Sequence, residues 1–208
     1  MTRTIRQTGT GSAAAIPDVV IARIGVEHRA RDVVAAFSGA GDAAQAVVAA
    51  VRAAGVADGD IATSDVGLQT VETGPWEDRR REGYSASESL VVTVRDVASA
   101  AWVLQAATAA ARDATRIDSV TFALSDGAAP AAAARDAAFA DARAKAEQYA
   151  DLSGDALGAV LSIADDPSSA PRPQVMFAAR AAAPGSGPAM EAGERIVTAQ
   201  VVVEWELV

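Results

Sequence analysis

The sequence contains no cysteine and only one histidine, and these two shortages exclude several kinds of active site. Without cysteine the chain has no disulfide, no thiolate nucleophile and no cysteine-based zinc site. With His28 as the only imidazole, two or three histidines cannot bind a metal within one chain, and a Ser-His-Asp triad would have to use this residue. No Gly-x-Ser-x-Gly pattern supplies a nucleophile elbow. We therefore expect no enzymatic activity, no cofactor and no metal site.

Aromatic residues make up only 4% of the 208 residues, and acidic residues outnumber basic ones, which gives a formal net charge of −9. An acidic surface repels phosphate backbones and anionic lipid headgroups, so nucleic acid is not an expected partner. No apolar run approaches the roughly 18 residues that a membrane-spanning helix needs. No apolar segment of a signal peptide follows the charged N-terminus. We expect a protein with no membrane span and a cytoplasmic location.

Hydrophobic residues are nevertheless abundant, at 50% of the chain, and their spacing predicts both strands and helices. Alternation over 18–29 and 84–95 is typical of half-buried strands. Spacing by threes and fours over 32–54 predicts a helix, in which Gly39 and Gly41 are candidates for a kink or a break. The other expected elements are a short strand at 2–8 that ends at Gly9-Thr10-Gly11, strands at 61–73, 117–124, 159–164 and 195–207, and helices at 96–112 and 130–152.

These elements predict an α+β fold, with a mixed, mostly antiparallel sheet that carries about three helices on one face. Residues 18–73 and 84–124 each run strand, helix, strand, which suggests two βαβ-like pseudo-repeats. We expect a single domain over 1–208. Residues 165–194 are rich in Pro, Ala, Gly and Ser, so this segment is expected to be a long mobile loop.

Several short segments follow one another in an order that is typical of one protein family. They are Gly9-Thr10-Gly11 with Pro17-Asp18, Ala53-Ala54-Gly55-Val56, Asp60-Ile61-Ala62-Thr63-Ser64, Gly83-Tyr84-Ser85-Ala86-Ser87, Val94-Arg95-Asp96, Phe122-Ala123-Leu124-Ser125-Asp126, the helical segment 137–150, Leu157-Gly158, and Gly193-Glu194 with Val201-Val202-Val203-Glu204-Trp205. This ordered series resembles the SIMPL-domain family, and it covers nearly the whole chain although no single motif is specific. The chain departs from the family at Ala192, where a proline often stands.

The resemblance implies a fold and an oligomer, but no reaction, since no catalytic residue set is established for the family. Bacterial members are often periplasmic or secreted, and some are linked to self-assembly or stress tolerance. Many members carry a signal peptide, whereas none is predicted here.

Three features could carry chemistry, and each also has a plain structural explanation. Gly9-Thr10-Gly11 precedes a loop and lacks the third glycine of a phosphate-binding loop, so a turn or bulge is expected. Asp58, Asp60 and Asp65 are spaced somewhat like oxygen ligands, but no EF-hand pattern completes them, so solvated loop acids are expected. Glu88 lies on the inward face of its strand, where a carboxylate needs a partner such as arginine, or access to water.

Four residues are candidates for contacts with a protein partner. Trp76 and Arg80 lie in a predicted hairpin tip of mixed charge, where an aromatic side chain can anchor a contact. Met176 and Phe177 are apolar residues in the predicted loop. They could dock onto the same chain or onto a neighbouring subunit.

Two functions remain open from the sequence. The first is a non-enzymatic, SIMPL-like protein of unknown role that self-assembles as a homo-oligomer, because exposed strand edges are natural pairing surfaces. The alternative is a module that binds a small apolar ligand in a cleft walled by Phe37, Trp102, Phe139 and Tyr149. These same rings could instead fill the core.

Overall fold

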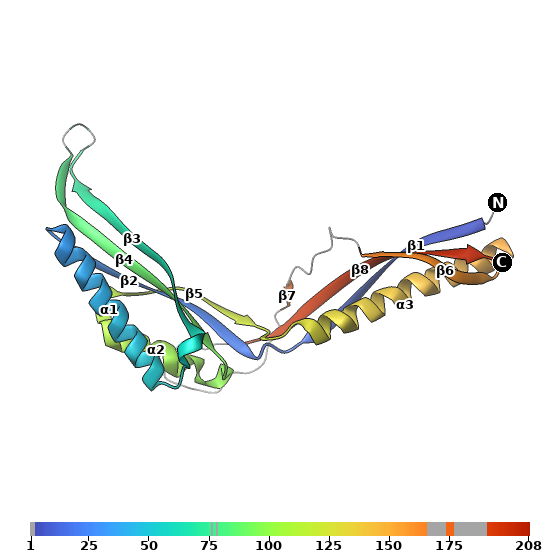
Figure 1. The fold of residues 1–208 in the computed structure, drawn as a ribbon, viewed down its shortest axis with the longest axis horizontal. Coiled ribbons are helices and arrows are strands. Elements are labelled where there is room, and N and C mark those ends of the chain that lie inside the picture. The colour runs from blue at the N-terminus through green and yellow to red at the C-terminus, as the bar shows by residue number, and fades with distance from the viewer. Residues whose placement is uncertain (1–2, 76, 78, 166–173, 177–190) are drawn as a thin grey trace. The chain divides into compact units, whose positions relative to one another are not determined.

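The computed structural model describes residues 3–75, 77, 79–165, 174–176 and 191–208, which form two compact units (Figure 1). The terminal unit contains residues 3–17, 126–165, 174–176 and 193–208, so it holds both ends of the described chain. The central unit contains the described residues from 18 to 125, together with 191 and 192. Each unit has its own antiparallel sheet.

The central unit is built from two similar halves. The first consists of β2 (Val19–Ala30), α1 (Val33–Ala53) and β3 (Ile61–Thr73), and the second consists of β4 (Arg80–Val94), α2 (Ala100–Ala111) and β5 (Thr115–Ala123). The strand order is β3-β4-β2-β5, and neighbouring strands are antiparallel. The two strands of each half are therefore parallel, with a strand of the other half between them. This is the split βαβ arrangement, and it confirms the two pseudo-repeats.

Helices α1 and α2 cover the same face of the central sheet, and the core lies between them and the sheet (Figure 1). Helix α1 begins after Asp32, whose carboxylate accepts a hydrogen bond of 2.9 Å from the amide of Ala35, as an N-cap does. The buried core residues include Val20, Ala22, Ile24, Val26, Val47, Val51, Leu90, Val92, Val94, Val103, Leu104 and Ala107. None of these buried residues is aromatic, so aliphatic side chains from the strands and the two helices supply this core.

Helix α1 is continuous through both of its glycines, so the predicted kink or break is wrong. The two glycines differ in their surroundings. A Cβ atom at Gly39 would overlap the ring of His28, whereas a Cβ atom at Gly41 would meet open space. The only histidine of the chain is thus held against the helix backbone.

By length and composition alone, α1 could cross a membrane, with a mean hydropathy of 1.4 over its best window. The sequence-based statement that no apolar run is long enough is therefore corrected. In the structure α1 packs its buried residues Ala36, Ala40, Ala44, Val47 and Val51 into the central unit. That packing accounts for the apolar composition, as in the core helix of a folded unit.

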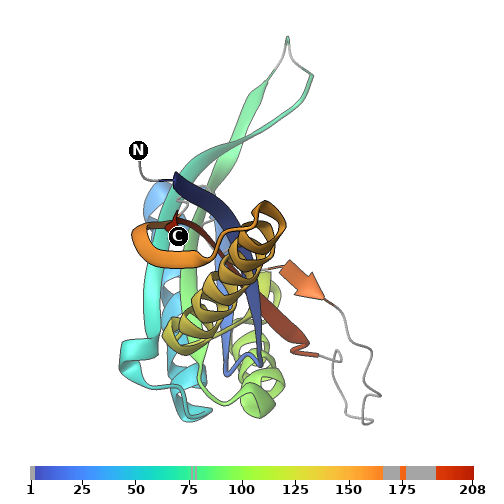
Figure 2. The ribbon, with the colours of Figure 1, turned by 90° about the vertical axis from the view of Figure 1, so that its right-hand side faces the viewer.

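The terminal unit consists of β1 (Arg3–Ala15), α3 (Ala128–Ser153), β6 (Leu157–Asp165), β7 (Gln174–Met176) and β8 (Glu194–Leu207). The order in its sheet is β1-β8-β6, and the short β7 also pairs with β8. Helix α3 runs along one face of this sheet (Figure 2). Strand β1 continues through Gly9-Thr10-Gly11, where the sequence predicted that it would end.

Glycines in β1 and alanines in α3 bring the helix backbone directly onto the sheet. A Cβ atom at Gly9 would overlap the backbone of Ala138, and one at Gly11 would overlap the backbone of Ala134. The helix buries an alanine at every fourth position, namely Ala134, Ala138, Ala142, Ala146 and Ala150. At the same interface, the ring centroids of Phe139 and Trp205 lie 6.2 Å apart.

The α+β class is confirmed, but the strands form two antiparallel sheets in place of the single mixed sheet that was expected. The reason is that the first and last strands pair with each other, from Arg3 with Leu207 to Ala15 with Arg195. Within the predicted loop 165–194, residues 174–176 form a strand, while 166–173 and 177–190 lie outside the described residues.

Candidate interaction surface

The four predicted contact residues are divided between the two units. Arg80 is an exposed residue at the start of β4, where it pairs with Thr73 of β3. Met176 ends β7 and pairs with Glu194 of β8 in the terminal unit. Trp76 and Phe177 lie outside the described residues. The structure therefore describes two of these four residues, one in each unit.

The aspartates near the start of β3 form separate ion pairs. Asp58 pairs with Arg52 at 2.6 Å. Asp60 accepts two hydrogen bonds of 2.7 Å from the guanidinium of Arg95, and these bonds hold the pKa of Asp60 below its ordinary value. The part of the chain that the structure describes contains no cluster of acidic and histidine residues able to hold a metal ion. The two arginines supply the countercharge that a cation would supply.

A buried serine and a carboxylate meet on the face of the central sheet opposite the helices. The hydroxyl of Ser85 donates a hydrogen bond of 2.8 Å to Glu27, and Arg29 donates one of 2.7 Å to the same oxygen. Arg116 lies 3.7 Å from the other oxygen of Glu27. Hydrogen bonds from Arg29 and then Ser85 lower the pKa of Glu27. A carboxylate held ionised in this way links β2, β4 and β5, and no imidazole activates the serine.

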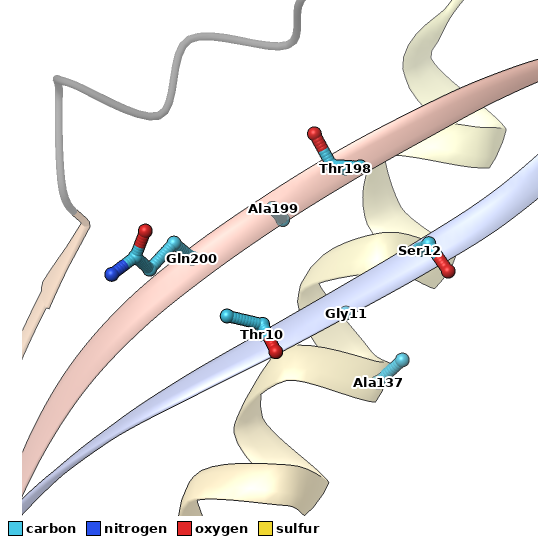
Figure 3. Close-up of a pocket in the computed structure, with 7 residues that line it drawn as sticks. All are labelled: Thr10, Gly11, Ser12, Ala137, Thr198, Ala199 and Gln200. Carbon is cyan, nitrogen blue, oxygen red and sulfur yellow. The ribbon is translucent and has the colours of Figure 1, made fainter. Parts of the chain in front are cut away.

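A shallow hollow of about 540 Å³ lies in the terminal unit (Figure 3). Strands β1 and β8 line it with pairs that face each other in register, Thr10 with Gln200 and Ser12 with Thr198. Ala137 of α3 completes one side. These side chains can form neutral hydrogen bonds, but none of them titrates near neutral pH. The hollow therefore offers polar contacts without an acid or a base for catalysis.

The outer edge of β1 is blocked by side chains of α3. The amide of Thr10 donates a hydrogen bond of 2.8 Å to Asp141, and the ammonium group of Lys145 donates one of 3.1 Å to the carbonyl of Thr8. Lys145 and Asp141 also pair with each other at 2.7 Å. Unpaired amides and carbonyls along a strand edge are templates for pairing with another chain. Helix α3 satisfies two of these groups on β1.

At the opposite edge of the same sheet, the described residues provide no such cover. Among the described strands, β6 pairs only with β8, and α3 packs along β1 and β8 with little contact to β6. Three large apolar side chains of β6 are exposed, Val160 by 42%, Leu161 by 50% and Ile163 by 60%. The same strand thus combines a free backbone edge with a cluster of apolar side chains. We call Val160, Leu161 and Ile163 with this free edge the β6 surface.

The β6 surface was not among the contact sites predicted from the sequence. The strand at 159–164 was predicted, but its place at an edge depends on strand order, which the pattern did not give. The sequence did contain a signal for it, the apolar neighbours Val160 and Leu161 followed by Ile163. Adjacent side chains of a strand point to opposite faces, and α3 covers only one face of this sheet, so these three residues cannot all be buried by α3.

The four rings predicted as walls of an apolar cleft are divided between the two units. Phe37 and Trp102 are exposed in the central unit, and Tyr149 is exposed in the terminal unit. Phe139, also in the terminal unit, packs against Trp205. Neither unit by itself therefore holds all four rings.

Comparison with known proteins gives matches that span both units. The model of the SIMPL family, described as a protein of unknown function (DUF541), matches residues 5–205. The chain is 30% identical over 222 aligned positions to the 26 kDa periplasmic immunogenic protein of Brucella melitensis biotype 1, covering 98% of this chain and 84% of the relative. The protein of the same name from Brucella abortus strain S19 matches with the same identity and coverage. This chain belongs to the SIMPL family.

Proposed function

We propose that this chain is a non-enzymatic protein that self-assembles, and that a second copy of the chain covers the β6 surface. The observation that carries the proposal is the difference between the two edges of the terminal sheet. Side chains of α3 occupy the β1 edge, while β6 presents a free edge with exposed Val160, Leu161 and Ile163. An exposed apolar edge strand is a site of association between chains.

The register of β6 indicates how a second copy would fit. Val160 lies opposite Trp205, and Ile163 lies opposite Val203, so both point to the face of the sheet that α3 covers elsewhere. An antiparallel pairing of two β6 strands about a two-fold axis joins the two sheets and brings these residues of both copies together. The apolar side chains then leave water at the same time as the backbone groups pair.

A role without catalysis fits the chemistry of the described side chains. His28, the only histidine, lies against Gly39 of α1. Two of the three aspartates that were candidates for a metal site, Asp58 and Asp60, are paired with arginines. These arrangements favour a protein whose activity is binding, and they argue against acid–base chemistry at these positions.

The cellular location is part of the proposal. The sequence analysis expected the cytoplasm, whereas both Brucella relatives carry the word periplasmic in their names. We propose the periplasm for this chain also on the strength of these relatives, and a chain without cysteine is compatible with either compartment. Fractionation of the native host tests this, and recovery of the protein in the cytoplasmic fraction alone would overturn it.

The assembly state is tested by size-exclusion chromatography with light scattering. We expect the full chain to elute as a defined oligomer and Ile163→Lys to elute with a lower mass, because a charge among the apolar side chains that the two copies bury is costly. Val34→Lys is the matched control, since Val34 is an exposed apolar residue of α1 in the central unit and its replacement should leave the mass unchanged. A monomeric full chain, or an oligomer that persists in Ile163→Lys, contradicts the proposal.

A further inference from the structure

Glu88 interrupts the apolar row on the helix-covered face of β4. Its neighbours in that row, Ala86 and Leu90, are each 1% exposed. Across the sheet, Glu88 stands in register between Val26 of β2 and Val66 of β3. Glu88 itself is only partly buried, so water reaches its carboxylate. The residue is thus a charged group, open to solvent, within an otherwise apolar row.

The described residues give Glu88 one partner, the hydroxyl of Thr63, which donates a hydrogen bond of 3.1 Å. The sequence predicted an arginine partner, or a position at the sheet's end where water reaches the carboxylate. Water does reach it, although β4 is an inner strand of the sheet. Arg52 lines the same cavity, but its guanidinium pairs with Asp58 at 2.6 Å. In the part of the chain that the structure describes, the carboxylate of Glu88 has no ion pair.

A cavity of about 380 Å³ lies over Glu88, beside α1. Small residues on one side of the helix, Gly41, Ala44 and Ala49, leave this space, and Val48 and Gln45 complete the wall. On β3, Val66 and Leu68 lie on the same face as Glu88 and are exposed, because α1 packs on β2 and β4. The cavity has the volume of a small-ligand site, and its lining combines small and apolar residues with Gln45 and two charged residues, Glu88 and Arg52.

We propose that this cavity binds a small organic cation, an ammonium group carried on an apolar body, with Glu88 as its counter-ion. The carboxylate would repel an anion, and a neutral ligand would leave its charge uncompensated. An inorganic cation such as Ca²⁺ requires six or more oxygen ligands, which this cavity does not supply. The apolar body lies against Val48 and extends over Val66, while the ammonium group reaches Glu88.

Octylammonium is the probe, and 1-octanol and octanoate are matched ligands with the same apolar body and a different head. Titration calorimetry at pH 7 should show octylammonium binding at least about tenfold more tightly than octanol, which corresponds to about 1.4 kcal/mol. Octanoate should bind most weakly. In Glu88→Gln, octylammonium should lose this preference while octanol binding is unchanged.

Two further variants separate a specific site from general attraction to an acidic protein. Asp42→Asn removes one negative charge from the exposed side of α1, next to Gly41, without changing the cavity. It should leave octylammonium binding unchanged. Gly41→Leu fills open space in the cavity and strengthens the helix, so it should abolish binding of both octylammonium and octanol in a folded protein.

Three results would overturn the proposal. The first is the absence of octylammonium binding to the full chain. The second is an equal loss of binding in Asp42→Asn and Glu88→Gln, which would show that net charge alone attracts the cation. The third is unchanged binding in Gly41→Leu with helix content retained by circular dichroism.

Discussion

Gly9 of β1 lies directly against the backbone of Ala138 in α3, with no room for a Cβ atom between them. The contact joins the first strand of the chain to a helix that begins more than a hundred residues later. A glycine on the strand and alanines on the helix are both needed for this approach. The packing of the terminal unit therefore depends on the missing Cβ atom of Gly9 and on the small side chains of the facing alanines.

Gly9→Ala should destabilise the terminal unit, because the new methyl group overlaps the Ala138 backbone and forces the helix away from the sheet. Overpacking of this kind costs about 1–3 kcal/mol. Urea unfolding followed by circular dichroism measures the loss. Gly41→Ala is the control, since its methyl group meets open space inside α1 and should raise stability by about 1 kcal/mol. Equal stability of Gly9→Ala and the unchanged protein would contradict the close approach.

Removal of the Asp141 carboxylate should open the β1 edge. In Asp141→Ala the amide of Thr10 loses its acceptor, so hydrogen exchange at that amide should become faster. Light scattering should show stronger association, because an unprotected edge pairs with other chains. Arg143→Ala serves as the comparison, since Arg143 pairs only with Glu147 on the same helix among the described residues. Unaltered exchange at Thr10 in Asp141→Ala would show that the helix does not protect this edge.

Stability should fall in acid because four carboxyl groups have pKa values below the ordinary 3.8 of Asp or 4.5 of Glu. The main cause is a hydrogen bond from the Ser125 hydroxyl for Asp18, from Arg29 for Glu27, from Arg95 for Asp60 and from Lys145 for Asp141. A group whose pKa is lower in the folded state stabilises the fold fully above its unfolded pKa. That contribution is lost as the pH falls through the folded pKa.

The urea midpoint should therefore change little above about pH 5 and decline steadily below about pH 4. Asp60→Asn should show a shallower decline, since it removes one of the four groups. The measurement is a series of urea titrations from neutral to acidic pH. A midpoint that rises on acidification would show that burial, and not hydrogen bonding, governs these carboxyl groups.

Ser85→Ala should destabilise the central unit by about 1 kcal/mol, because Glu27 loses one of its hydrogen bonds while Arg29 remains. Thermal unfolding of both proteins measures the difference. Ser38→Ala is a suitable reference, because among the described residues the exposed Ser38 hydroxyl makes only a long hydrogen bond of 3.5 Å, to the carbonyl of Ala35 in α1. A loss no larger than that of the reference would show that the Glu27 cluster contributes little.

The alternation of apolar and polar residues predicted most elements of the central unit, because β2 and β4 each have one face in the core and one in water. The same pattern revealed the two halves. It gave no strand order, because a pseudo-repeat is compatible with adjacent or interleaved strands. The interleaving depends on pairings such as Ile24 with Leu90, between residues far apart in the chain.

The terminal unit was harder to predict from local pattern. Gly9-Thr10-Gly11 is typical of a turn, and only the distant alanines of α3 make those glycines part of a strand. The exposed residues of β6 look like ordinary core residues in the sequence. Their exposure arises because the one helix of this unit packs over β1 and β8. Inward-facing Glu88 was identified from its strand, while its cavity depends on the small residues of α1.

Asp18 and Ser125, the first and last residues of the central unit's main segment, are hydrogen-bonded to each other. Asp18 accepts hydrogen bonds of 2.6 Å from the amide and 2.5 Å from the hydroxyl of Ser125, and the amide of Asp18 donates one of 3.1 Å to the carbonyl of Ala123. All pairings of the central sheet lie between these two residues. The segment 18–125 therefore begins and ends at neighbouring positions, which is the geometry of a domain inserted into another at a single point of its chain.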